Sequence, residues 1–241
     1  MSAGQRRECD TIRLLTEATT VTDPVIVATG FTREARTIID SGVVAITGGG
    51  VAANLERALT AAAGRGAAGI ISYGLAGALA DGLKIGDWII GSRVVGAIAL
   101  ETDPAWTKSL LARLARARVG SFFADGRMID TVAEKRALGV RHGALAVDME
   151  SHVAARVAQA HGIPFAIVRI VSDEVGHLLP PAITVSMRPD GGLHAAAMLR
   201  SLAANPRQIG DVAKTMSQFA RGFGGLKAGA RLLHPRMAFP G

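Results

Sequence analysis

The sequence predicts a single α/β domain with a central mixed, mostly parallel β-sheet that is flanked by helices. Short apolar runs alternate with helix-length segments, which is the pattern of strand–helix–strand units. The length of 241 residues suits one such domain. Hydrophobic residues make up 49% of the chain and aromatic residues only 4%, so the core is expected to consist of Ala, Val, Leu and Ile.

The expected strands are short buried runs that end in glycine or polar residues. In chain order they are 24–28, 43–46, 68–72, 144–147 and 165–171, and a further strand begins at Trp88. The expected helices are amphipathic or rich in alanine. They are 32–40, 51–63, 104–120, 151–160, 193–204 and 208–221. Residues 176–192 contain Pro180, Pro181 and Pro189, which indicates a long loop that forms a lid or channel wall.

The positive net charge of the chain limits the kinds of binding partner to expect. The formal net charge is +7, and from Arg200 to the end the chain has seven Lys or Arg residues and one Asp. Such an excess fits a solvated face, an anionic membrane surface or nucleic acid. Few aromatic residues are available as stacking platforms for single-stranded nucleic acid, so no nucleic-acid partner is expected.

Cysteine content and hydropathy indicate the compartment. The single cysteine, Cys9, rules out a disulfide framework and a cysteine-based metal site, and it fits a reducing cytoplasm. The six histidines show no metal-ligand spacing. The uncharged stretches 41–55 and 66–80 are too short and too rich in glycine to span a membrane. We expect a mobile N-terminus at 1–20, one domain at 21–222 and a basic tail at 223–241.

Small or acidic residues follow five of the expected strands. The carboxyl ends of parallel strands share one edge of the sheet, where ligands bind in such folds, so these motifs are expected to form one site. They are Gly30, 48–50, 72–77, 148–150 and 172–173. Alone, 48–50 indicates either a tight turn or an anion cradle, and it does not match the dinucleotide-binding pattern. The glycine turn at 74–77 either allows close packing or lets a sugar lie against the backbone.

The carboxylate motifs also have two interpretations each. Asp148 and Glu150, with Met149 between them, either cap and complement a helix or bind a ligand. Ser172-Asp173 either ends a strand or holds an acid against apolar walls. Such walls would raise the pKa of the acid and let it carry a proton near neutral pH. Glu34, four residues after Gly30, is by itself typical of a solvated helix residue.

Together these motifs resemble the purine/uridine phosphorylase family, and in particular its methylthioadenosine/S-adenosylhomocysteine nucleosidase branch. The resemblance extends from Val25 to about Ser172. Its most specific parts are the run V-D-M-E-S at 147–151 and the S-D pair at 172–173. The glycine turns are weaker support.

The resemblance implies a nucleoside phosphorylase-like fold and a role for each residue. Asp173 protonates N7 of the departing purine, and Glu34 activates the attacking water. Glu150 holds the ribose hydroxyls, and Met149 packs on the sugar face. Breaking an N-glycosidic bond leaves positive charge on the sugar and negative charge on the base, which these groups match. Residues 126–129 border the base, and the further expected substrate contacts are Gly30, Leu75, Gly77 and Ser172.

Departures from the family pattern bear on the nucleophile. Ser72 and Leu75 stand where the phosphorylases have an Arg and a Ser or Thr for phosphate, and Glu34 stands in place of another Arg. Water is therefore favoured over phosphate, although Arg33 and Arg36 keep phosphorolysis open. No metal or organic cofactor is expected, and phosphate is the possible co-substrate.

The run at 146–156 and the prolines of the long loop resemble the hopanoid-associated phosphorylase subgroup. This resemblance implies adenosylhopane as substrate, an apolar channel, a homodimer, and contact of the basic tail with the inner membrane face. The alternatives are a soluble methylthioadenosine/S-adenosylhomocysteine nucleosidase and a non-catalytic nucleoside- or lipid-binding protein. A dinucleotide-binding oxidoreductase is disfavoured by the glycine spacing.

Overall fold

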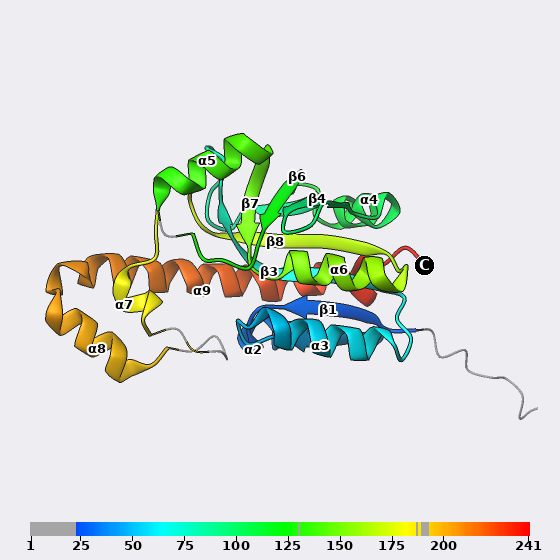
Figure 1. The fold of residues 1–241 in the computed structure, drawn as a ribbon, viewed down its shortest axis with the longest axis horizontal. Coiled ribbons are helices and arrows are strands. Elements are labelled where there is room, and N and C mark those ends of the chain that lie inside the picture. Colours follow the sequence, from blue (N-terminus) through cyan, green and yellow to red (C-terminus); the bar gives the residue numbers. More distant parts are fainter. Residues whose placement is uncertain (1–22, 130, 187, 189–192) are drawn as a thin grey trace, which may run out of the picture.

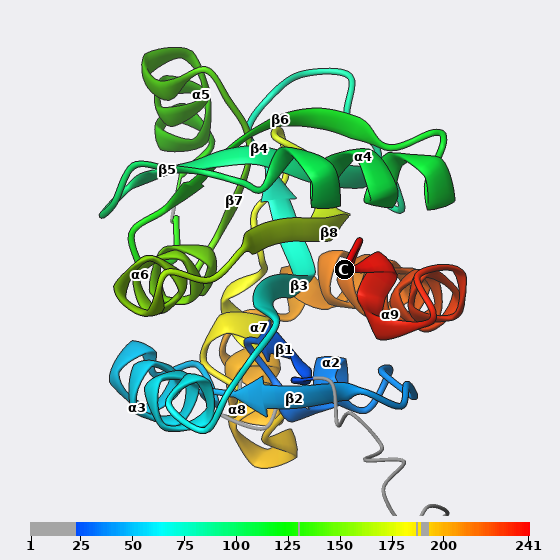
Figure 2. The same ribbon diagram turned by 90° about the vertical axis from the view of Figure 1, so that its right-hand side faces the viewer.

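The structure is a computed structural model that describes residues 23–129, 131–186, 188 and 193–241. The expected mobile N-terminus, 1–20, lies outside the described residues. A mixed sheet runs through the middle of the molecule with helices on both sides (Figures 1 and 2). The predicted fold class, a single α/β domain with helices flanking a mixed sheet, is confirmed.

In the part of the chain that the structure describes, the sheet has eight strands. They are β1 (Val25–Thr29), β2 (Val43–Thr47), β3 (Gly69–Ala78), β4 (Trp88–Gly96), β5 (Leu100–Glu101), β6 (Arg118–Ala124), β7 (Ala144–Asp148) and β8 (Phe165–Asp173). Parallel pairs join β1 to β2 and β3, β3 to β8, and β6 to β4 and β7. Antiparallel pairs join β3 to β7 and β4 to β5 and β8. The pairings β3–β8–β4–β6–β7–β3 therefore close a ring, and β1 and β2 extend from it.

The helices are α2 (Thr32–Ala35), α3 (Ala52–Ala63), α4 (Pro104–Arg113), α5 (Val132–His142), α6 (Ser151–His161), α7 (Pro181–Thr184), α8 (Ala195–Ala204) and α9 (Ile209–Leu232). Two 3-10 turns, η1 (Pro206–Gln208) and η2 (Arg236–Ala238), adjoin α9. Within the described part of the chain, no helix is long and apolar enough to cross a membrane.

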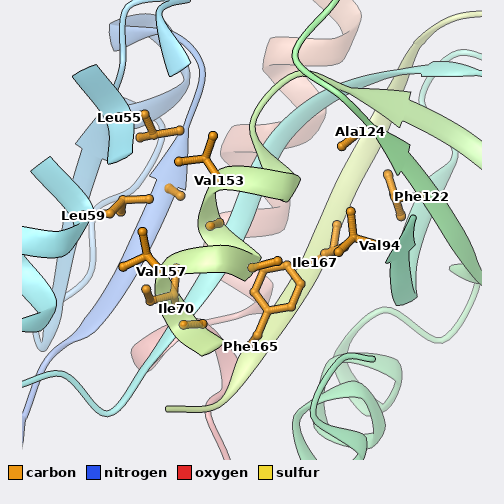
Figure 3. Packing of buried hydrophobic residues seen from close by; sticks show 14 of the residues in the cluster. Leu55, Leu59, Ile70, Val94, Phe122, Ala124, Val153, Val157, Phe165 and Ile167 are labelled. Carbon is orange, nitrogen blue, oxygen red and sulfur yellow. The ribbon is translucent and has the colours of Figure 1, made fainter. Parts of the chain in front are cut away.

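One face of the sheet is covered by α3 and α6, which lie side by side (Figure 2). Leu55 and Leu59 of α3 and Val153 and Val157 of α6 are buried against Ile70 of β3, as Figure 3 shows. Burial of a Leu or Val side chain contributes roughly 1.5–3 kcal/mol, so this layer holds the strands that carry the site.

The opposite face is covered by α4 and α9 (Figure 2). The segment 223–241, expected as a basic tail, belongs to this layer. Gly229 of α9 packs against the Trp88 ring, and Leu233 and Met237 are buried. Buried residues recur every three or four positions along α9, so this helix packs one side against the sheet. Its charged residues lie on the exposed side of that helix.

Three other local expectations were wrong. Residues 118–120, expected as helix, begin β6: α4 ends at Arg113, and 118–120 pair with Ile89–Gly91 of β4. Residues 74–77, expected as a glycine turn, lie inside the ten-residue strand β3. The described part of the expected loop at 176–192 contains the short helix α7, and residues 187 and 189–192 lie outside the described residues. α7, α8 and the start of α9 extend beyond the sheet (Figure 1).

Candidate active site

A cavity of about 600 Å³ opens at the ends of β3, β7 and β8. Seven of the eight predicted site residues line it: Glu34, Leu75, Gly77, Met149, Glu150, Ser172 and Asp173. The eighth, Gly30, lies behind the wall. A Cβ atom there would stand 2.6 Å from Oε1 of Glu150, so glycine makes room for that carboxyl group. Arg127, Met128 and Ile129 also line the cavity, within the segment expected to border the base.

A buried arginine that the sequence analysis did not single out organises the cavity floor. Arg169 of β8 is 1% exposed. Its Nε lies 3.2 Å from Oδ2 of Asp148, and its Nη2 lies 3.1 Å from Oε2 of Glu150. Nη2 also donates to Oγ of Ser72 (2.7 Å), and Nη1 donates to the carbonyl of Leu75 (2.9 Å). One guanidinium thus joins β3, β7 and the start of α6.

Asp148 fixes the start of α6. Its Oδ1 accepts the N–H groups of Glu150 (2.9 Å) and Ser151 (2.7 Å), which is the capping role weighed above. The carboxyl groups of Asp148 and Glu150 both face Arg169. The capping interpretation therefore applies to Asp148, and ligand binding by Glu150 stays a prediction.

Glu34 is buried at 2% exposure, contrary to its solvated appearance in the sequence. Its Oε2 accepts the N–H groups of Gly30 (2.8 Å) and Phe31 (3.0 Å), and its Oε1 accepts that of Leu75 (2.8 Å). A Cβ atom at Gly74 would stand 2.5 Å from Oε1 of Glu34. Burial raises the pKa of Glu34, while Arg169 and the three N–H groups oppose that rise.

On the cavity floor, the carboxyl groups of Glu34, Asp148 and Glu150 outnumber their one buried cation, Arg169. Burial raises the pKa of Glu150 to about 7; Arg169 opposes the rise, and Asp148 and Glu34 add to it. Burial alone would lower the pKa of Arg169, but the three carboxyl groups raise it above its ordinary value, so it stays charged. Glu150 therefore gains a proton near neutral pH.

Asp173 lies at the end of β8 in a setting unlike the apolar walls that the sequence suggested. Its Oδ2 forms an ion pair with the ammonium of Lys135, which reaches it from α5. Its Oδ1 accepts the hydroxyl of Ser172 at 2.7 Å. A Cβ atom at Gly77 would lie 3.0 Å from Oδ2 of Asp173, so glycine again gives space to a carboxyl group.

Beyond these polar groups the cavity wall becomes largely apolar. It is formed by the segment after β8 and by α7 and α9, with a few polar side chains such as Gln208 and Asp211 among them. The apolar members are Leu178, Leu179, Pro180, Pro181, Leu193, Met216, Phe219 and Phe223. Within the described residues, no group of three or more His, Cys, Asp or Glu side chains could hold a metal ion.

Arg169 and Lys135 were missed for different reasons. A charged residue inside the apolar run 165–171 is a recognisable signal, because an unpaired buried arginine is rare. Lys135 lies between Glu134 and Arg136 on α5, where its sequence context resembles that of a solvated side chain.

The raised pKa of Glu150 predicts a pH dependence of stability. Its pKa is 4.5 ordinarily and about 7 in the folded protein. The protonated form therefore stabilises the fold fully below pH 4.5, and this contribution is lost as pH rises through about 7. The free energy of unfolding should therefore fall as pH rises. In Glu150→Gln this fall should be smaller, by up to about 3 kcal/mol.

Urea unfolding at pH 5 and pH 8 measures this difference. Glu56→Gln is the matched control, because Glu56 forms an exposed ion pair with Arg156. Equal pH dependence in wild type and Glu150→Gln would show that Glu150 is not the titrating group.

Known proteins resemble the chain in sequence and in fold. The sequence profile of the phosphorylase superfamily matches residues 12–202. No curated protein matches the sequence.

Solved structures resemble the fold at low sequence identity. The 5′-methylthioadenosine/S-adenosylhomocysteine nucleosidase of Helicobacter pylori is 16% identical with a TM-score of 0.63, over 88% of this chain and 96% of that chain. The futalosine hydrolase of Helicobacter pylori is 16% identical with a TM-score of 0.62, over 89% of this chain and 97% of that chain. The nucleosidase of Neisseria meningitidis is 15% identical with a TM-score of 0.61, over 86% and 97%. These similarities support the fold, and the profile, which matches well over half of the sequence, shows that the chain belongs to the phosphorylase superfamily.

Proposed function

We propose that this protein releases adenine from a 5′-modified adenosine by hydrolysis of the N-glycosidic bond. One observation carries the proposal: a single cavity has Asp173 on its wall together with Glu34 and Glu150, two carboxyl groups that share the buried Arg169. Nucleosidases among the similar solved structures support the same reaction class.

The charge distribution suits the transition state of this reaction. Bond breaking leaves positive charge on the ribose, and the carboxyl groups around Arg169 provide negative charge next to it. Glu150 binds the ribose hydroxyls, and Met149 packs on the sugar. Asp173 gives a proton to N7 of the leaving base, with Ser172 holding its carboxyl group. Leu75 and Gly77 of β3 complete the wall beside the nucleoside.

Water is the preferred nucleophile because Glu34 occupies the place of an anion. Three backbone N–H groups, from Gly30, Phe31 and Leu75, already donate to its carboxylate. Phosphate would have to displace a buried carboxylate of the same charge sign. The raised pKa of Glu34 makes it a better base for activating water.

Phosphorolysis is the second candidate, and Arg33 is the observation that favours it. Arg33 lines the cavity, and its guanidinium lies 4.2 Å from the centre of the Phe223 ring. A phosphate near Arg33 would meet a positive charge that is independent of Arg169.

The apolar outer wall supports a large apolar 5′ substituent. Leucine, proline, methionine and phenylalanine side chains continue from the nucleoside end of the cavity towards α7 and α9. We propose a lipid-linked adenosine, with adenosylhopane as the specific substrate. Methylthioadenosine and S-adenosylhomocysteine are the smaller alternatives, and they leave most of that wall uncovered.

Membrane contact and a homodimer are further proposals. The expected basic tail is packed, so contact would involve the exposed lysines and arginines of α9 together with Leu178 and Met216 at the cavity wall. Truncation would remove α9 from the core, so charge reversal of Lys214 and Arg221 is the better variant for co-sedimentation with anionic vesicles. Unchanged sedimentation would argue against membrane contact. The homodimer is tested separately, by light scattering of the protein in solution.

Asp173→Asn should lower the rate of adenine release by about 10²–10⁴-fold while substrate still binds, because an amide cannot replace the acid. Chromatographic detection of adenine and calorimetric binding measure the two effects. Asp211→Asn, a change at another acidic residue of the cavity wall, is the control and should keep the rate. A wild-type protein that binds nucleosides but releases no base would instead be a non-catalytic binding protein.

The nucleophile can be read from the sugar product. Hydrolysis predicts free 5′-modified ribose, formed at the same rate with and without phosphate. A sugar 1-phosphate, or a rate that depends on phosphate concentration, would establish phosphorolysis.

The apolar wall predicts a dependence on chain length. For 5′-alkylthioadenosines, kcat/KM should rise by roughly fourfold for each methylene that becomes buried. Met216→Ser should reduce this gain, whereas Leu232→Ser, an exposed change on the same helix but outside the cavity lining, should not. A series with no length dependence would contradict the lipid-linked substrate.

A further inference from the structure

Lys135 is a buried cation that has no assigned role in the proposed reaction. It lies on α5, yet its side chain is only 4% exposed. Its ammonium contacts Oδ2 of Asp173 and donates to the carbonyls of His177 (2.8 Å) and Glu174 (3.3 Å). An ammonium has three donor hydrogens, and three acceptors are present.

The acceptors connect two parts of the cavity. Asp173 ends β8, whereas Glu174 and His177 begin the segment that leads to the apolar wall at 178–181. Lys135 therefore fixes the position of the proposed acid relative to the wall that contacts the 5′ substituent. Burial of an ammonium is costly unless it is fully paired, and the three acceptors provide that pairing for Lys135.

Other charged groups near Asp173 are engaged elsewhere. The Glu174 carboxylate pairs with Lys84 at the surface, at 3.1 Å. The His177 ring contacts the ammonium of Lys214 from α9. On the β3 and β7 side, Asp173 faces the uncharged Gly77 and Val147. Among the described residues, Lys135 is the cation that forms an ion pair with the Asp173 carboxyl group.

We propose that Lys135 is a positioning residue for Asp173, and that its charge stabilises the carboxylate that remains after Asp173 protonates the leaving base. This inference rests on the proposed function. In the step concerned, the C1′–N9 bond breaks and its electron pair passes to the purine. The Asp173 proton moves to N7, and Asp173 becomes a carboxylate beside the Lys135 ammonium. The water oxygen bonds to C1′ and gives its proton to Glu34.

Lys135→Met should lower kcat by at least about tenfold with a smaller change in KM, because the carboxylate product of the proton transfer loses its counter-charge. It should also move the alkaline limb of the pH profile of kcat/KM to higher pH, because loss of a neighbouring positive charge favours the protonated acid. Lys135→Arg keeps the charge and should retain the wild-type limb. Lys84→Met removes the lysine that pairs with Glu174 at the surface, and it should leave both kcat and the pH profile unchanged.

A double-mutant cycle tests whether Lys135 acts through Asp173. In the Asp173→Asn background, Lys135→Met should have no further effect on the rate. An additional loss there, or wild-type kcat and pH profile in Lys135→Met, would overturn the inference. Circular dichroism checks folding; if Lys135→Met is unfolded, the comparison of Lys135→Gln with Lys135→Arg decides by the same criteria. Absence of base release from the wild type would instead refute the proposed function.

Discussion

The buried guanidinium of Arg169 is the interaction on which the arrangement of the cavity depends. It contacts Ser72 and Leu75 of β3, Asp148 at the end of β7 and Glu150 before α6. These elements are separated by up to about 100 positions in the chain, so no local interaction could hold them together. Removal of one partner from a buried ion pair costs about 3–5 kcal/mol, and here three carboxyl groups would lose their shared cation.

This network also explains why the two ends of the cavity differ in charge. Around Arg169 the carboxyl groups outnumber the cation, and burial shifts the pKa of Glu150 to about 7. At the other end Asp173 and Lys135 form a separate one-to-one pair. A substrate that separates charge along its breaking bond meets an excess of negative charge at one end and a charge-balanced ion pair at the other.

Much of the fold could be predicted from the sequence, because buried strands and amphipathic helices leave strong local patterns. The strands at 25–29, 43–47 and 165–173 and the helix at 151–161 are examples. The site was predicted less completely. Asp173 ends a recognisable strand, and Glu34 and Glu150 follow soon after two others. The partner of Asp173 comes from α5, a helix whose pattern gives no sign of it. β6 was missed because its burial depends on β4 and β7, which are remote in sequence.

The glycines marked the right region for a different physical reason. At 74–77 we expected a turn that either allows close packing or lets a sugar lie against the backbone, but Gly74 and Gly77 lie within a strand. Gly30, Gly74 and Gly77 stand against Glu150, Glu34 and Asp173, respectively, each too close for a side chain to fit without displacement of the carboxyl group. Because each glycine gives space to a carboxyl group, the same backbone that could approach an anionic ligand is already occupied by the anions of the protein itself. A site built in this way favours a substrate that develops positive charge over one that brings a second anion.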